Sequence, residues 1–130
     1  MDIEIRYLGW AIILGLAQLL LASTLVTRQR GLAWNAGPRD DEPGPPPGVA
    51  GRAGRAMRNF LETFPFFAAA VLAAVATGRA DAGTALGVQL YLWARIVYVP
   101  LYLAGIPYLR SLAWAVSLGG LLMVLWPLLR

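Results

Sequence analysis

The sequence predicts an all-α integral membrane protein folded as a bundle of four transmembrane helices. Of the 130 residues, 58% are hydrophobic and only 14% are charged, whereas a soluble domain carries about 25% charged residues. Four apolar stretches each approach the roughly 20 residues that cross a bilayer as a helix. Proline, glycine and arginine collect between them. Residues 1–130 are therefore predicted to form a single membrane domain.

The first predicted helix covers residues 7–27, where Gln18 is the most polar side chain. A signal peptide is the alternative for such an N-terminal stretch. However, acidic Asp2 and Glu4 stand beside Arg6 before it, and the apolar run is longer than that of a signal peptide. These features favour a retained helix.

The other three predicted helices cover residues 55–77, 83–104 and 109–129. The second contains Glu62, the third contains Arg95, and the fourth is uncharged after Arg110. Residues 28–54 are predicted to form a long proline-rich loop, because proline prevents helix and stiffens the chain. We interpret this segment as a solvated loop, with a lid over an anion site as the alternative.

Arginine counts predict the orientation of the bundle. The first and third loops hold most of the arginines, whereas the opposite side holds only Arg6, Arg79 and Arg130. By the positive-inside rule, loops one and three face the cytoplasm and both termini lie on the other side. The arginines of the predicted cytoplasmic side are Arg28, Arg30, Arg39, Arg52, Arg55, Arg58 and Arg110.

The second predicted helix carries its polar side chains on one face. Arg55, Arg58, Asn59 and Glu62 follow the spacing i, i+3, i+4, i+7, which places them in a sector about 100° wide. A charge that faces lipid costs at least about 2.5 kcal/mol. The face is therefore expected to contact other helices or a wet cavity.

The third predicted helix offers a matching face. Tyr91, Arg95, Tyr98 and Tyr102 fall within about 60° of one another at helical spacing. Arg95 lies roughly 14 Å from the predicted cytoplasmic end and needs an anion. Glu62 is the only carboxylate inside an apolar stretch, so we predict a Glu62–Arg95 ion pair.

Such a pair can simply fix the register of two helices, and this structural interpretation stands beside a functional one. The functional interpretation depends on the excess of arginine at the cytoplasmic mouth over buried carboxylate. Fork-shaped guanidinium groups suit carboxylate ligands. An anion site at this mouth is therefore expected.

Composition excludes several kinds of chemistry. The chain has no cysteine and no histidine, so a protein thiolate and the usual zinc and haem ligands are lacking. All eleven basic residues are arginines, which excludes a Schiff-base lysine. No metal or haem is expected. The net charge of +4 bears on topology, and no nucleic-acid partner is expected.

Several motifs resemble those of the MAPEG family, the membrane-associated proteins in eicosanoid and glutathione metabolism. "RAGRAMRNFLETFPFF", residues 52–67, resembles the family signature Arg-x-x-Arg-Ala-x-x-Asn-x-x-Glu with its aromatic-proline continuation. "ARIVYVPLY", residues 94–102, is similar to the third-helix segment. "YLRSLAW", residues 108–114, and "TRQRGLAWNAGPRDDE", residues 27–42, are similar to the start of the fourth helix and the end of the first. The likeness covers the chain in order and is to the bacterial-type members.

The resemblance implies a homotrimer of four-helix subunits that binds glutathione between neighbours, near the cytoplasmic helix ends. Arg95 matches a buried arginine that meets the helix-two glutamate. Arg110 and Ser111 match positions that stabilise the glutathione thiolate. The expected glutathione contacts are Arg28, Arg58, Asn59, Glu62, Tyr98 and Tyr102.

The function expected from the resemblance is a membrane-bound glutathione transferase or peroxidase. Glutathione would be the co-substrate, and a lipophilic electrophile would arrive through the membrane lipid, with the bacterial inner membrane as the expected location. A non-enzymatic module of the same fold, which binds a lipid or small anion, is the alternative. A small transporter is the third hypothesis, but the chain shows no internal repeat to support it.

Overall fold

The computed structural model describes residues 2–40 and 44–130. The helices in chain order are α1 (Ile3–Arg30), α2 (Leu32–Ala36), α3 (Gly48–Ala76), α4 (Ala82–Leu103) and α5 (Pro107–Leu129). All except the short α2 are long and apolar enough to cross a membrane. The described chain contains no strand, and the predicted all-α membrane bundle is confirmed.

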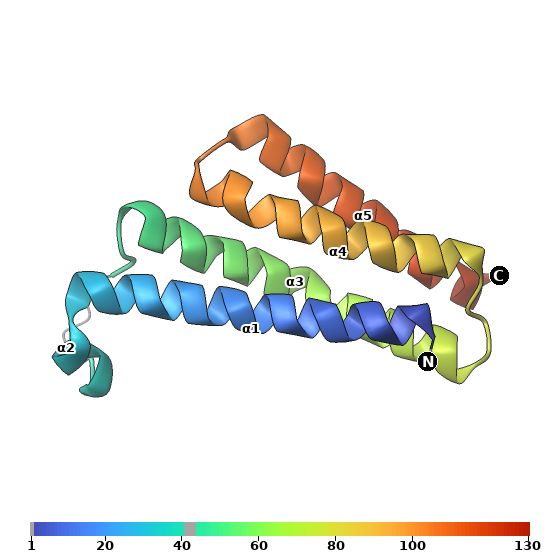
Figure 1. Cartoon of the computed structure of the whole chain (residues 1–130), viewed down its shortest axis with the longest axis horizontal. Coiled ribbons are helices and arrows are strands. Elements are labelled where there is room, and N and C mark those ends of the chain that lie inside the picture. Colours follow the sequence, from blue (N-terminus) through green and yellow to red (C-terminus); the bar gives the residue numbers. More distant parts are fainter. Residues whose placement is uncertain (1, 41–43) are drawn as a thin grey trace.

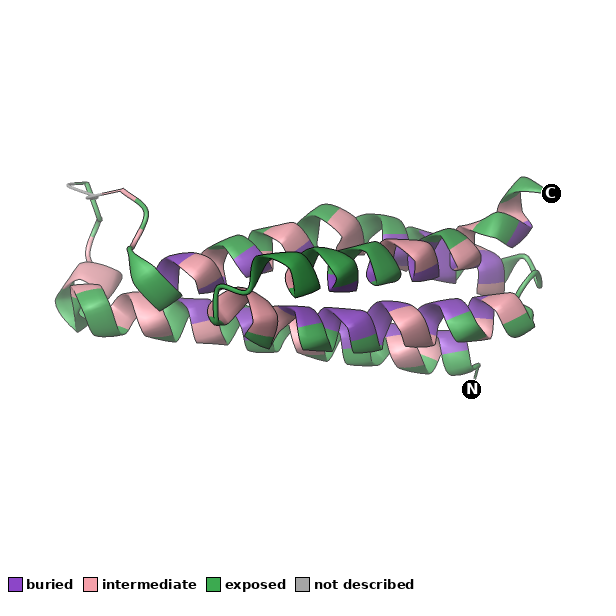
Figure 2. Cartoon of the chain, turned by 90° about the horizontal axis from the view of Figure 1, so that it is seen from above, coloured by how far each residue is buried: buried purple, intermediate pink, exposed green. Residues whose placement is uncertain are grey.

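The long helices lie side by side and alternate in direction along the bundle (Figure 1). One end, here called the terminus end, holds both termini and the α3–α4 turn. The other, called the loop end, holds α2 and the α4–α5 turn. Helix α4 packs most extensively against α5, and α1 packs against α3. Figure 2 shows the buried residues on the helix surfaces that face one another.

The helix bounds differ from the expected ones in the first loop. Helix α1 continues to Arg30, and α3 begins at Gly48 rather than at residue 55. Pro47 is the N-cap of α3. The run of prolines ends there, and no residue from 48 to 64 is a proline that would prevent helix. The predicted loop 28–54 is therefore shorter and contains α2, while its residues 41–43 lie outside the described part.

Prolines lie inside three of the long helices without ending them. Helix α3 continues through Pro65, α4 through Pro100 and α5 through Pro127. Neighbouring helices and local adjustments can satisfy the backbone groups that such prolines free inside a membrane. The helices thus remain available over their full lengths to position side chains.

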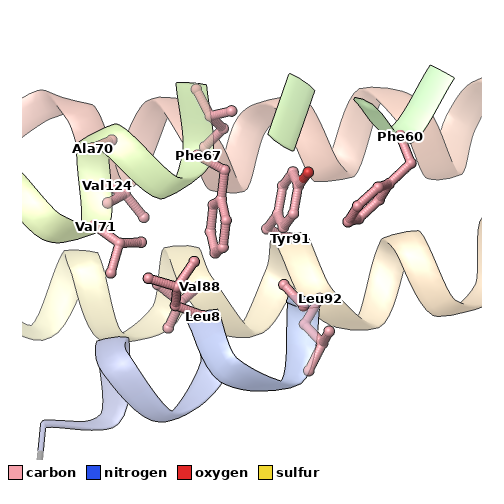
Figure 3. Packing of buried hydrophobic residues seen from close by; sticks show 11 residues of the cluster. Leu8, Phe60, Phe67, Ala70, Val71, Val88, Tyr91, Leu92 and Val124 are labelled. Carbon is pink, nitrogen blue, oxygen red and sulfur yellow. The ribbon is translucent and has the colours of Figure 1, made fainter. Parts of the chain in front are cut away.

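The core between α3 and α4 is aromatic (Figure 3). The rings of Phe67 and Tyr91 stack with centroids 3.9 Å apart and an interplanar angle of 10°. The hydroxyl of Tyr91 lies 3.0 Å from that of Thr63, which satisfies a phenol that would otherwise be buried alone. Phe60 packs over Gly15 of α1, where an added Cβ would lie 3.0 Å from its ring.

Helices α4 and α5 touch through their backbones. A Cβ on Gly120 would lie 2.5 Å from the carbonyl oxygen of Gly87. A Cβ on Gly87 would lie 2.6 Å from the carbonyl oxygen of Gly120. Small residues permit this approach, which drives helix association where lipid removes the hydrophobic contribution.

Polar contacts fasten the terminus end. The buried Glu4 carboxylate of α1 lies 3.1 Å from the hydroxyl of Thr84 at the start of α4. Asp81 and Thr84 form a reciprocal capping box, the arrangement that satisfies two orphan donors at a helix start. Arg130 pairs with Asp81 at 2.8 Å, and Arg79 donates to the carbonyl oxygen of Arg130 at 3.0 Å.

Candidate functional site

A buried arginine lies between α3 and α4. Arg95 is 0% exposed, and its Nη1 donates to Oδ1 of Asn59 at 2.8 Å. Its guanidinium carbon lies 4.2 Å from the ring centroid of Tyr98 and 5.7 Å from that of Phe60. These ring faces attract the cation where water is excluded. Nε and Nη2 of Arg95 have no hydrogen-bond partner in the described chain, so two nitrogen atoms of the guanidinium can still donate to an additional acceptor.

The aromatic contacts continue from Arg95 toward the loop end. The rings of Tyr98 and Tyr102 lie one helical turn apart with centroids 5.6 Å from each other. The guanidinium of Arg110, from the first turn of α5, lies 4.6 Å from the centroid of Tyr102. We call Arg95, Tyr98, Tyr102 and Arg110 the arginine–tyrosine ladder. It brings together four residues that sequence reasoning singled out.

Arg55 of α3 also reaches this ladder. Its guanidinium carbon lies 6.0 Å from the centroid of Tyr102, on the same ring that Arg110 covers. Arg55 belongs to the polar face predicted for this helix but was not among the expected glutathione contacts. Its position in the signature, two turns before Glu62, was the signal that could have identified it.

Glu62 does not pair with Arg95 in the described chain. Glu62 is exposed, and the hydrogen bond of Arg95 goes to Asn59 instead. The physical reason is the helical register, because three residues rotate a side chain by about 300°. Asn59 faces α4, while Glu62, which ideal helix geometry turns about 60° from it, is exposed. The expected Glu62–Arg95 ion pair is corrected to an Asn59–Arg95 hydrogen bond.

Arg58 lies on the side of α3 that faces α1, whereas the ladder lies on α4 and α5. It lines a cleft of about 700 Å³ between the second half of α1 and the first half of α3. The apolar wall of this cleft includes Leu19, Val26 and Met57. Four arginines line the cleft: Arg30, Arg39, Arg55 and Arg58. Two of them donate to oxygens of the protein, Arg30 to the carbonyl of Gly44 and Arg39 to the carbonyl of Asn35.

The described part of the first loop folds over this cleft. Arg30 donates to the carbonyl oxygen of Gly44, and Gln29 donates to that of Pro47 at 3.2 Å. Trp34 of α2 lies under two guanidinium groups, each 4.7 Å from its ring. These contacts place the described part of the loop against the end of α1.

The remaining expected site residues lie apart. Arg28 is exposed and lines a shallow hollow on α1 with Thr24 and Leu32. Ser111 is exposed, and its hydroxyl donates to the carbonyl oxygen of Pro107 at 3.2 Å. Asn59 is thus hydrogen-bonded to the ladder, and Ser111 follows the ladder's Arg110 in the chain. Arg28 and Arg58 line other surfaces of the described chain.

The described residues contain no cluster of three or more histidine, cysteine, aspartate or glutamate side chains that could hold a metal ion. Glu4 is a buried carboxylate that was not among the expected site residues, because it precedes the predicted first helix. Its contact with Thr84 assigns it to the packing of α1 on α4.

Comparison with known proteins gives one family. The model of the MAPEG family matches residues 7–130, nearly the whole chain. A search of curated proteins found no match to the chain. The match includes α3, α4 and α5 completely and therefore all residues of the ladder.

Proposed function

The chain belongs to the MAPEG family, and on this premise we propose that it activates the thiol of glutathione for reaction with lipophilic electrophiles. Membership makes it an integral, multi-pass membrane protein of a glutathione and eicosanoid metabolism family. The specific activity proposed is that of a transferase or peroxidase. The observation that carries the proposal is the arginine–tyrosine ladder.

The ladder offers the groups that a small anionic peptide needs. Arg110 and Arg55 present guanidinium groups on the ring of Tyr102 at the loop end, and guanidinium binds carboxylate through two parallel hydrogen bonds. The phenols of Tyr98 and Tyr102 can donate to or accept from peptide groups. Arg95 contributes a positive charge deeper in the bundle. Glutathione carries two carboxylates, two peptide groups and a thiol, and fits this set.

The chemistry requires a thiolate, because the thiolate rather than the thiol is the nucleophile. A guanidinium at Arg110 would stabilise that charge as the thiol proton passes to water. Ser111 could add a hydroxyl donor after its side chain rotates away from the Pro107 carbonyl. In transfer, the sulfur forms a bond to an electrophilic carbon, and the displaced electron pair leaves with a departing group or an opened-ring oxygen, which takes a proton.

Peroxidase chemistry at the same site would use two glutathione molecules. They are oxidised to a disulfide while a lipid hydroperoxide is reduced to an alcohol and water. The protein has no cysteine, so both sulfur atoms must come from the co-substrate. The exposed apolar helix surfaces would admit the lipophilic partner from the bilayer (Figure 2).

We infer that a homotrimer completes the site. Arg28 and Arg58 line surfaces beside α1 rather than the α4–α5 side where the ladder lies, yet an intersubunit site would place them against the ladder of a neighbour. A closed cyclic assembly provides such a heterologous contact at every interface. Its mass in detergent, measured by native mass spectrometry, tests the subunit number.

Mixed assemblies test whether two chains share the site. Arg58→Ala and Arg110→Ala subunits, each inactive alone, are expected to recover activity when assembled together in equal amounts. If one neighbour supplies each arginine, about one quarter of the interfaces in a random mixture contain both. A mixture as inactive as its two components would show that a single chain supplies both residues.

Glutathione binding is the direct test of the proposal. Calorimetry on the detergent-solubilised protein should show binding that weakens in Arg110→Ala and persists in Arg130→Ala, a control at the terminus end. An ultraviolet thiolate signal should accompany binding to the native chain and disappear in Arg110→Ala. Binding without a thiolate signal would favour a non-enzymatic binding module, and no binding would refute the glutathione assignment.

The arginine distribution supports an orientation for this activity. Arg28, Arg55 and Arg110 lie toward the loop end together with the ladder's mouth. We infer that the loop end faces the cytoplasm and that the chain resides in a bacterial inner membrane. Cytoplasmic glutathione would then reach the ladder directly.

A further inference from the structure

We propose that a second site, a groove between α1 and α4 at the terminus end, binds one phospholipid molecule. The groove has a volume of about 630 Å³, within the range of about 300–1,000 Å³ typical of ligand sites. It lies along the half of the bundle remote from Arg110, and it shares no lining residue with the arginine cleft. Residues that form it include Arg6, Tyr7, Trp10, Ala17, Trp93 and Ile96.

Arg6 provides the headgroup site. It is exposed, and its guanidinium makes no hydrogen bond or ion pair with another described residue. Tyr7 and Trp10 follow it on α1 and line the same groove. Aromatic residues of this kind lie at the headgroup level of membranes. A lipid phosphate at Arg6 would meet a positive charge with free donors.

The depth of the groove fits an acyl chain. From Ile3 to Ala17 the α1 side of the groove rises about 21 Å, compared with roughly 15 Å for the hydrocarbon of one leaflet. The lower wall consists of apolar side chains such as Ile13, Leu92 and Ile96. A molecule with its phosphate at Arg6 would therefore place its chain along this wall and end near the bilayer midplane.

Charge favours a lipid over a helix of a second copy. An apolar helix face packed into the groove would cover the exposed guanidinium of Arg6 without supplying the acceptor that a lipid phosphate offers, and covering an unpaired cation is costly. The two indoles that border the groove, Trp10 and Trp93, are 57% and 58% exposed and would flank the acyl chain.

The experiment uses the full chain in detergent and phosphatidylglycerol as the probe. Native mass spectrometry should count one tightly bound phospholipid per chain. Arg6→Ala is expected to weaken binding about fivefold to tenfold through loss of the phosphate contact. Ala17→Trp should block the chain and abolish binding. The matched controls are Arg130→Ala, an exposed arginine at the same end, and Ala115→Trp, an exposed alanine on α5.

Each outcome decides the proposal. Weaker binding in both groove variants, with both controls unchanged, supports it. Equal binding in all four variants overturns it. Loss in Ala17→Trp alone assigns the groove to an apolar molecule without a phosphate and also overturns it.

A cysteine probe tests whether a second copy of the chain, rather than a lipid, occupies the groove. The chain has no cysteine, so Trp93→Cys introduces a single thiol at the groove. Oxidative cross-linking of this thiol between subunits would show that a second copy fills the groove and would overturn the lipid assignment. Labelling that lipid slows, without cross-linking, supports it. These measurements are independent of glutathione binding and leave the proposed activity untouched.

Discussion

Asn59 of α3 and Arg95 of α4 are joined by a hydrogen bond of 2.8 Å at a point where the arginine is fully buried. A cation facing lipid would be expensive, and here the amide oxygen and two ring faces replace its water. The bond also connects α3, which carries the family signature, to α4, which carries every residue of the ladder except Arg110.

We predict that Asn59→Leu destabilises the protein by about 2–3 kcal/mol, because the buried guanidinium loses its acceptor. The measurement is thermal unfolding in detergent. Glu62→Gln is the matched control, since Glu62 is exposed, and it should shift stability by less than about 0.5 kcal/mol. A larger loss of stability in Glu62→Gln than in Asn59→Leu would instead support the Glu62–Arg95 ion pair predicted from the sequence.

The backbone contact between α4 and α5 gives a second prediction. Gly120→Ala would place a Cβ 2.5 Å from the Gly87 carbonyl oxygen, and such overpacking costs about 1–3 kcal/mol. Gly119→Ala is the control, because nothing lies within 4 Å of its added Cβ. Gly119→Ala should leave the stability of the protein unchanged or raise it slightly, because alanine has a higher helix propensity than glycine. Equal melting of the two variants would contradict the observed approach of the helices.

The ring of Tyr102 should support glutathione binding by holding two guanidinium groups. Tyr102→Leu removes the face on which Arg110 and Arg55 lie, and losing about 0.5–2 kcal/mol of cation–π attraction would raise the glutathione Kd about 2- to 30-fold. Tyr102→Phe keeps the ring and should stay near the native Kd if the hydroxyl is dispensable. Calorimetry measures both. If Tyr102→Leu binds glutathione with the native Kd, the stacking of Arg110 and Arg55 on this ring does not contribute to binding.

Membrane sidedness is testable with single thiols in a chain that has none. Ala80→Cys lies in the α3–α4 turn and Ala104→Cys lies in the α4–α5 turn, and both positions are exposed. An impermeant maleimide applied from outside the cell should label Ala80→Cys, while Ala104→Cys reacts only after permeabilisation. The opposite pattern would invert the orientation inferred from the arginines.

The long helices could be predicted well from the sequence because the length of an apolar stretch is enough to identify a membrane-spanning helix. About 20 apolar residues must span a bilayer, and a proline-rich segment must interrupt them. The start of α3 was placed too late, because three of the seven residues 48–54 are glycines, which have low helix propensity, and only the capping position at Pro47 marks the boundary. Helix α2 has five residues, too few for a periodic pattern.

The site was harder to predict because it depends on angles between neighbouring residues. Spacing placed Arg58, Asn59 and Glu62 on one face of the helix. That face is about 100° wide, however, so its residues can contact different neighbouring helices or remain exposed. In the structure Arg58 lines the α1–α3 cleft, Asn59 faces α4, and Glu62 is exposed. Helical periodicity identified the candidates and only the packing of α1 and α4 could separate them.

The contact of Gly87 with Gly120 also determines how this bundle can move. Helices whose backbones touch cannot slide past one another without a steric barrier, so α4 and α5 form a stiff hairpin. If the bundle opens to admit a large ligand, the α4–α5 hairpin would then move as a unit, by a hinge-like displacement relative to α1 and α3. The ladder is carried wholly by the stiff hairpin, from Arg95 to Arg110, and would keep its geometry throughout such an opening.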